Sequence, residues 1–175
     1  YQTEVTGFGF IGEGARCVTV SADKRERVWD LTGKQVAEFA GSGGSLGSVA
    51  VRPDGLLLAD RGAENKVFVW TRADGKFAAT LETPAVVSRL QYTADGTKLL
   101  AGGADKHLRA FDAVDYRLLD DTTVAMPVTV LAAVPESRSI VTLAAGNNAA
   151  VYETPLLALL TGHEGAVTDI AYTPD

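Results

Sequence analysis

One large aromatic residue recurs at a constant 41-residue interval along this chain. The four positions are Trp29, Trp70, Phe111 and Tyr152, and each closes a short apolar stretch. A fixed spacing of about 40 to 45 residues is typical of folds built from repeated four-stranded units. Such a unit buries both faces of its sheet only by stacking on neighbouring units. The spacing therefore predicts a stack of similar sheets.

Other positions repeat in the same register. The polar turn Pro53-Asp54-Gly55 returns one period later as Ala94-Asp95-Gly96. Two apolar columns precede the turns, with period-two alternation: one holds Phe8, Val49, Leu90 and Leu131, and the other holds Phe10, Val51, Tyr92 and Ala133. Polar turns between alternating apolar segments indicate strands joined by hairpins.

The register predicts three further strands in each repeat. The second strands are expected at 17–20, 56–59, 98–101 and 140–143, and the third strands at 26–30, 66–71, 107–112 and 149–153. The fourth strands are expected at 35–39, 77–81, 116–119 and 156–160. Because no segment shows capped helical periodicity, we expect an all-β chain of β-propeller blades, each with four antiparallel strands.

The third strand of the first repeat carries a more specific pattern. The segment Ser21-Ala22-Asp23-Lys24-Arg25-Glu26-Arg27-Val28-Trp29-Asp30 resembles the WD40 family, whose repeats end this strand in Trp-Asp after a turn with serine and aspartate. The later repeats match this pattern less well, because the positions of Trp-Asp are occupied by Trp70-Thr71, Phe111-Asp112 and Tyr152-Glu153. The resemblance implies structural roles for ten residues: Ser21, Asp23, Trp29, Asp30, Trp70, Asp105, Phe111, Asp112, Tyr152 and His163.

The same register divides residues 1–175 into one repeat unit with four blades and a remainder. The blades are expected at about 5–41, 46–82, 87–123 and 128–162, and the extra first strand of a fifth blade at 163–175. Gly162-His163 resembles the dipeptide that opens a WD40 blade, so His163 is expected to lack its usual partners here. Three interpretations stay open: a piece of a longer propeller, a half-propeller that pairs with a second copy into a ring, and a small self-closed ring.

Charge and composition narrow the classes of partner. The chain has 22 acidic and 16 basic residues, a net charge of −6, which argues against nucleic acid and anionic membrane surfaces as partners. Cys17 is the one cysteine, so no internal disulfide forms, and its apolar surroundings predict a buried structural thiol. No apolar run is long enough for a transmembrane helix, and nothing indicates a cellular compartment.

The sequence offers no catalytic, cofactor or metal constellation. His107 and His163 lie far apart, on a strand and a loop, and no metal-ligand spacing surrounds them. The glycine-rich segment 41–45 is expected to connect two blades, because no helix follows it to hold a phosphate. Asp120 and Asp121 are expected to form a solvated turn. We therefore expect a chain that is not an enzyme.

One position breaks the repeat. Glu26 stands where the other repeats carry Val67, Leu108 and Ala149, and we expect it to pair with Arg25 or Arg27 or to be exposed at the end of the stack. For partner binding, the residues near blade turns to test first are Arg61, Arg72, Lys106 and Asp105.

These observations favour a non-catalytic WD40-like module for protein–protein interaction or scaffolding, a homodimer that completes its ring with a second copy. The alternative is a structural or engineered propeller fragment whose main property is self-assembly. A third interpretation, a domain of a larger enzyme or redox protein, needs residues outside this segment.

Overall fold

The computed structural model describes residues 3–12, 16–40, 47–61, 64–71, 76–134, 140–143, 149–152 and 156–160. In these ranges the chain is all-β and contains no helix, and therefore no helix that could span a membrane. The strands form four antiparallel four-stranded sheets, and within each sheet the strands follow one another in chain order. The predicted fold of propeller blades is confirmed in this respect.

We call the four sheets blades one to four. Blade one contains β1 (Val5–Ile11), β2 (Arg16–Ser21), β3 (Arg25–Asp30) and β4 (Gln35–Ala40), and blade two contains β5 (Val49–Val51), β6 (Leu57–Arg61), β7 (Lys66–Thr71) and β8 (Phe77–Glu82). Blade three contains β9 (Val87–Tyr92), β10 (Lys98–Gly103), β11 (His107–Asp112) and β12 (Leu118–Thr123). Blade four contains β13 (Val130–Ala133), β14 (Ile140–Leu143), β15 (Ala149–Tyr152) and β16 (Leu156–Leu160).

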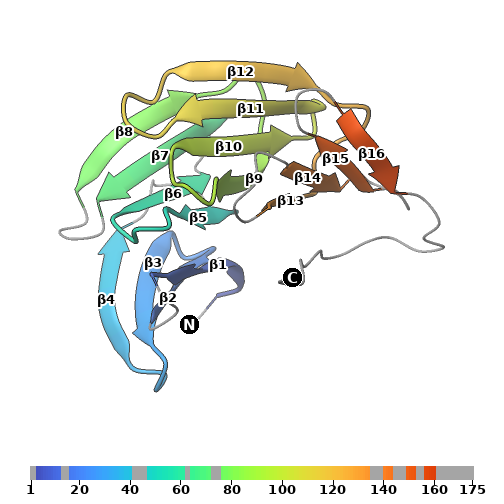
Figure 1. The fold of residues 1–175 in the computed structure, drawn as a ribbon. Helices are drawn as coiled ribbons and strands as arrows, with labels where there is room; N and C mark the ends of the chain where they lie inside the picture. Colours follow the sequence, from blue (N-terminus) through green and yellow to red (C-terminus); the bar gives the residue numbers. More distant parts are fainter. Residues whose placement is uncertain are drawn as a thin grey trace.

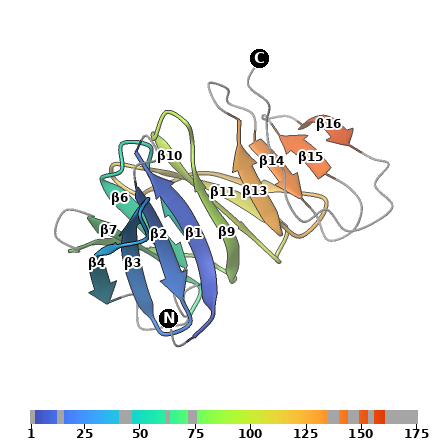
Figure 2. The same ribbon diagram turned by 90° about the horizontal axis from the view of Figure 1, so that it is seen from below.

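The blades are arranged along an arc, with blade one and blade four at its two ends (Figure 1). The first strand of each blade lies toward the centre of the arc, and the fourth strand lies at its outer rim. Consecutive inner strands contact one another, β1 with β5, β5 with β9, and β9 with β13. Seen from the open side of the arc, blade one lies in the foreground (Figure 2).

Apolar clusters fill the spaces between consecutive blades. Blades one and two enclose Ile11, Val18, Val20, Val28, Val49 and Leu58. Blades two and three share a larger cluster that includes Val67, Val69, Leu90, Tyr92, Leu99 and Phe111, and blades three and four enclose Leu100, Leu108, Val124, Val128 and Leu131. The two faces of a blade therefore have separate neighbours, one toward the preceding blade and one toward the following blade.

Two glycines allow neighbouring blades to approach closely. A Cβ atom at Gly7 in β1 would lie 2.9 Å from Cγ2 of Val20 and 3.5 Å from the backbone nitrogen of Val49 in blade two. A Cβ at Gly102 in β10 would overlap the side chain of Val128, on the approach to blade four. Glycine at these positions thus sets how tightly neighbouring blades pack.

An irregularity in strand pairing repeats in every blade at the same place. The register between the third and fourth strands shifts at Val28/Trp29, Val69/Trp70, Ala110/Phe111 and Val151/Tyr152. Each shift leaves one additional residue on the fourth strand, which is the arrangement of a β-bulge. The periodic aromatic residue therefore marks a bulge as well as the end of the third strand.

The structure corrects two predictions about the outer part of blade three. The fourth strand was expected at 116–119 and lies at Leu118–Thr123, because the turn before it is longer. In that turn Asp112 accepts hydrogen bonds from the backbone nitrogens of Val114 and Asp115, and Tyr116 has a φ of 61°. As a result Asp120 and Asp121 lie on β12 and not in a solvated turn.

Candidate protein-interaction surface

Among the described side chains, two large aromatic rings are exposed on the face of blade one that is turned away from blade two. We call this face the end face and define it by Phe8, Phe10, Cys17, Thr19, Arg27 and Trp29, which share one side of the sheet by their cross-strand pairing. Phe8 is 69% exposed and Phe10 60% exposed, and their rings meet edge to face with centroids 6.2 Å apart. Cys17 was predicted to be a buried structural thiol and is half-buried.

The same positions are covered in the other blades. Val49 and Leu90 occupy the place of Phe8 in blades two and three, and both are buried. Tyr92 occupies the place of Phe10 in blade three and is also buried. The two phenylalanines are therefore exposed because blade one lies at the end of the arc. The apolar pattern of its first strand is the same as in the covered blades.

Trp29 is held on the end face by a hydrogen bond from its indole. Its Nε1 donates to Oγ1 of Thr19 on β2, at 2.7 Å. In blade two, Trp70 Nε1 donates to Oδ2 of Asp60 at 2.5 Å, and Asp60 occupies the position of Thr19 in the next repeat. In blade three, the Phe111 side chain has no N–H donor, and Ala101 stands at the acceptor position. In these three blades an indole donor occurs together with an oxygen acceptor one strand away, and both are absent together. The aligned repeats of the sequence could have predicted this hydrogen bond.

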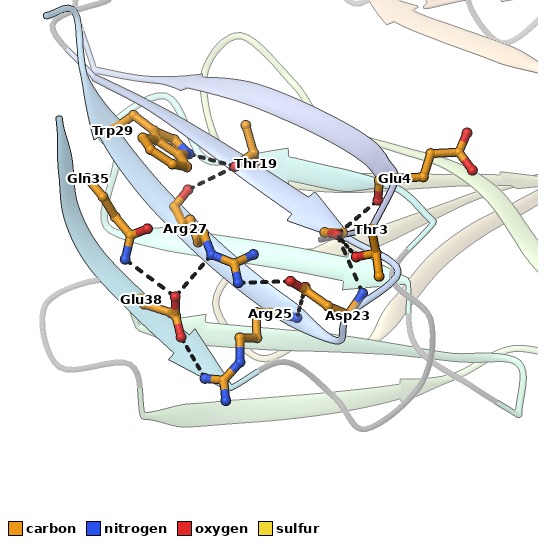
Figure 3. Close-up of polar contacts among 10 residues, drawn as sticks. Thr3, Glu4, Thr19, Asp23, Arg25, Arg27, Trp29, Gln35 and Glu38 are labelled. Carbon is orange, nitrogen blue, oxygen red and sulfur yellow. Dashed lines mark hydrogen bonds and ion pairs between the residues drawn. The ribbon is translucent and has the colours of Figure 1, made fainter. Parts of the chain in front are cut away.

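An ion-pair network covers the outer half of the end face (Figure 3). Arg27 on β3 lies 2.8 Å from Oδ2 of Asp23 and 3.0 Å from Oε2 of Glu38 on β4. Arg25 lies 2.6 Å from Oε1 of the same glutamate, and Gln35 donates to it at 3.3 Å. The hydrogen bond with Arg27 lowers the pKa of the Asp23 carboxyl.

Ser21 and Asp23 order the turn that leads into β3. Ser21 Oγ donates to the carbonyl oxygen of Glu4 at 2.9 Å, lies 2.8 Å from Oγ1 of Thr3, and accepts from the backbone nitrogen of Asp23 at 3.4 Å. Asp23 Oδ1 accepts from the backbone nitrogen of Arg25 at 3.1 Å. Side chains that satisfy backbone groups in this way stabilise tight turns.

A matching network lies on blade three. Arg109 is 2.7 Å from Oδ2 of Asp105 and 3.3 Å from Oδ2 of Asp121, and His107 Nδ1 is 2.6 Å from Oδ1 of Asp121. Asp105, His107 and Arg109 occupy the positions of Asp23, Arg25 and Arg27 two repeats later. The Arg109 side chain is only 4% exposed, whereas that of Arg27 is 13% exposed.

Two further predicted structural aspartates order turns at the ends of third strands. Asp30 accepts from the backbone nitrogens of Thr32 at 2.9 Å and Lys34 at 3.0 Å, and from the hydroxyl of Thr32. Asp112 accepts from Val114 and Asp115. In Asp30 the hydrogen bond from the Thr32 hydroxyl, followed by backbone hydrogen bonds, lowers the pKa, and in Asp112 backbone hydrogen bonds do so.

The structure describes three of the four predicted partner-binding residues, one on blade two and two on blade three. Arg61 is half-buried between blades two and three, where Nη1 donates to the carbonyl oxygen of Val87 at 3.4 Å. Lys106 is exposed in the turn before β11, with a φ of 63°, next to Asp105 in its ion pair with Arg109. Arg72, His163 and the side chain of Tyr152 lie outside the described residues, as do the glycine-rich connector and the extra strand at 163–175.

The described side chains include no group of three or more histidine, cysteine, aspartate or glutamate residues that could hold a metal ion. The end face instead combines exposed aromatic rings with paired charges. Aromatic residues and arginine are enriched at protein–protein interfaces, where they supply buried area and directional contacts. The chemistry of this surface thus suits contact with another protein surface.

The chain matches no family model. It is similar to proteins named eukaryotic translation initiation factor 3 subunit I. The relative from Aspergillus terreus is 30% identical over 102 residues, which are 58% of this chain and 30% of that protein. The relative from Phaeosphaeria nodorum is 26% identical over 169 residues, 96% of this chain and 49% of that protein. The chain therefore spans between about a third and a half of the length of these relatives.

Proposed function

We propose that this chain is a non-catalytic, WD40-like propeller module that binds another protein through the end face of blade one. The observation that carries the proposal is the exposure of Phe8 and Phe10 at positions where blades two and three are covered. Similarity to proteins named as a subunit of an initiation factor supports a role in a protein assembly. Burying the rings of Phe8 and Phe10 would remove a large apolar area from water, so binding of a protein to the end face is expected to be favourable.

The finer proposal is that a second copy covers the end face and completes a ring. Each internal junction places an apolar blade face against the next blade, as Val18 and Val28 do against blade two. Three periods later the sequence carries Val141 and Val151, on β14 and β15 of blade four. A two-fold pair would therefore repeat the internal junction twice, with blade four of one copy on blade one of the other.

Light scattering of the purified chain at several concentrations tests this pairing. A mass of twice the 18.4 kDa chain is expected, and a mass of 18.4 kDa at all concentrations overturns the second copy as the occupant. The substitution Phe10→Glu should dissociate the pair, because it places a charge in the junction. The matched control is Val114→Glu, at an exposed apolar residue in a turn of blade three, which should leave the mass unchanged.

The relatives favour a second candidate occupant, because they are two to three times as long as the matched segment. In this alternative, further blades of a longer chain cover the end face. The two candidates differ in a mixing experiment: a fragment that supplies those blades should bind the chain and displace any self-pair, and Phe10→Glu should weaken that binding as well. Failure of the fragment to bind would leave the second copy as the favoured occupant.

The residues near blade turns stay candidates for contact with a further partner. Among the candidates that the structure describes, Lys106 is exposed, whereas Arg61 is half-buried between two blades. We therefore expect Lys106→Ala to weaken binding of a rim-bound protein more than Arg61→Ala, relative to their effects on unfolding. Unchanged affinity of a purified partner for Lys106→Ala would remove this rim position.

A further inference from the structure

Two acidic side chains are buried against each other between blades one and two. Glu26 on β3 is 1% exposed and Asp60 on β6 is 0% exposed. The expectation that Glu26 pairs with a neighbouring arginine or is exposed was wrong, because its side chain points into the junction while Arg25 and Arg27 lie on the end face. Neither acid recurs in the other blades. The position of Glu26 is occupied there by Val67, Leu108 and Ala149, and the position of Asp60 by Thr19, Ala101 and Thr142.

The two carboxyl groups are joined by a hydrogen bond between their side chains. Asp60 Oδ2 also accepts the indole N–H of Trp70 at 2.5 Å, and a donor at this distance favours the ionised form of Asp60. Glu26 Oε1 has no hydrogen-bond partner among the described residues. A hydrogen bond between two carboxyl groups requires a proton on one of them, and these contacts assign that proton to Glu26.

In the part of the chain that the structure describes, Glu26 has no compensating positive charge beside it. Its cross-strand neighbours are Val20 on β2 and Phe39 on β4, and Asp60 is paired across its own sheet with Val49. Among the described residues, Asp60 is the one charged group found to act on Glu26. Burial, followed by the charge and the hydrogen bond of Asp60, raises the pKa of Glu26 to about 9.

We propose that Glu26 and Asp60 share one proton and form a latch that holds blade one against blade two, and that loss of this proton opens the junction. With both groups ionised, two like charges would face each other inside an apolar cluster. The least costly response is separation of the two blade faces, which hydrates the carboxylates and uncovers the apolar side chains packed around them. The latch does not depend on what occupies the end face.

The direction of the pH effect follows from the raised pKa. The folded chain binds more protons than the unfolded chain at every pH between the ordinary glutamate value of 4.5 and about 9. The stability that the protonated pair contributes is therefore fully present below pH 4.5, and it is lost as the pH rises toward 9. From pH 7 to 9 the thermal midpoint of the full chain should fall by about 5 to 10 °C.

The substitution Glu26→Gln tests the latch, because glutamine can donate the same hydrogen bond to Asp60 and cannot ionise. The thermal midpoint of this variant should stay nearly constant between pH 7 and 9, while that of the unsubstituted chain falls. Glu82→Gln on β8, at an exposed glutamate, is the matched control and should retain the fall. Parallel pH profiles for the unsubstituted chain and Glu26→Gln would overturn the proposal.

A second measurement reports on the junction itself. The indole N–H of Trp70, observed by nitrogen-15 NMR, should shift with pH in step with the carboxyl carbon of Glu26, identified by its loss in Glu26→Gln. Both signals should have a midpoint near 9. A glutamate signal that titrates near its ordinary value of 4.5, or an indole signal that does not respond, would overturn the latch even if the variant proved unstable.

Discussion

Blade one and blade three carry the same ion-pair network in different surroundings. In both, an aspartate before the third strand and an acid on the fourth strand flank one arginine, Arg27 or Arg109. The second side chain that contacts the acid of the fourth strand is Arg25 in blade one and His107 in blade three. The network of blade three lies in a junction, whereas that of blade one lies at the end of the arc beside two exposed phenylalanines.

The end face therefore has the construction of an internal face. A surface that evolved to meet water has no need of a network that matches a buried one, nor of two adjacent aromatic rings. Its energetic value nevertheless differs in the isolated chain, because exposed ion pairs contribute little while buried ones are costly to break. Substitutions at matched positions of the two blades therefore measure what the covering blade contributes.

The largest difference is expected for a pair of substitutions that compares a covered and an exposed apolar residue at the same position of the first strand. Leu90→Ala should cost about 2 to 5 kcal/mol in denaturant unfolding, since it creates a cavity between blades two and three. Phe8→Ala at the matching position should cost less than about 1 kcal/mol when the chain is studied as a monomer. A rise in the cost of Phe8→Ala with protein concentration would show that self-pairing buries this ring. A large cost at every concentration would instead place Phe8 in the core of the single chain.

A second pair of substitutions compares the two central arginines. Arg109→Met should lower the free energy of unfolding by about 1 to 3 kcal/mol, because the buried Arg109 side chain is lost from two carboxylates that are themselves 19% and 32% exposed. Arg27→Met should cost about 1 kcal/mol, because water reaches that network. Denaturant unfolding of both variants gives the comparison. Equal costs would contradict the claim that the end face is open to solvent.

The indole hydrogen bonds provide a smaller test. Trp70→Phe should destabilise the chain by about 2 kcal/mol, because the buried carboxylate of Asp60 loses its neutral donor. Trp29→Phe removes a hydrogen bond to a hydroxyl on the end face and should cost about 1 kcal/mol. Both values come from the same unfolding measurement. A larger loss at Trp29 than at Trp70 would mean that the end face is drier than the junction.

The smallest effect concerns the turn aspartates, where the two blades should behave alike. The pKa values of Asp30 and Asp112 are both lowered from 3.8, so their contributions are present above that pH and are lost as the pH falls through the lower folded values. Asp30→Asn and Asp112→Asn should each flatten the acid side of the stability profile by a similar amount. A difference between them would show that position in the arc also affects the exposed turns.

The repeat register predicted the blades because strand alternation, turns and aromatic spacing are local properties of the chain. The contact between Glu26 and Asp60 could not be predicted from the repeat register, because the two residues meet across a junction between blades and such contacts are non-local. Comparison of Asp60 with Thr19 at the same register position was the available signal. Asp121 was misplaced because the longer turn before β12 moves the fourth strand of blade three relative to the period.

The bulge in every fourth strand has a consequence for how such chains assemble. A fourth strand is the outer edge of its sheet, and a regular edge would offer its free backbone groups to the edge of another molecule. The additional residue next to each aromatic position interrupts that row of donors and acceptors, and in the first three blades it is Val36, Ala78 or Leu119, all exposed. Lateral growth into a continuous sheet is thereby discouraged, and association of these modules is left to the faces of their blades.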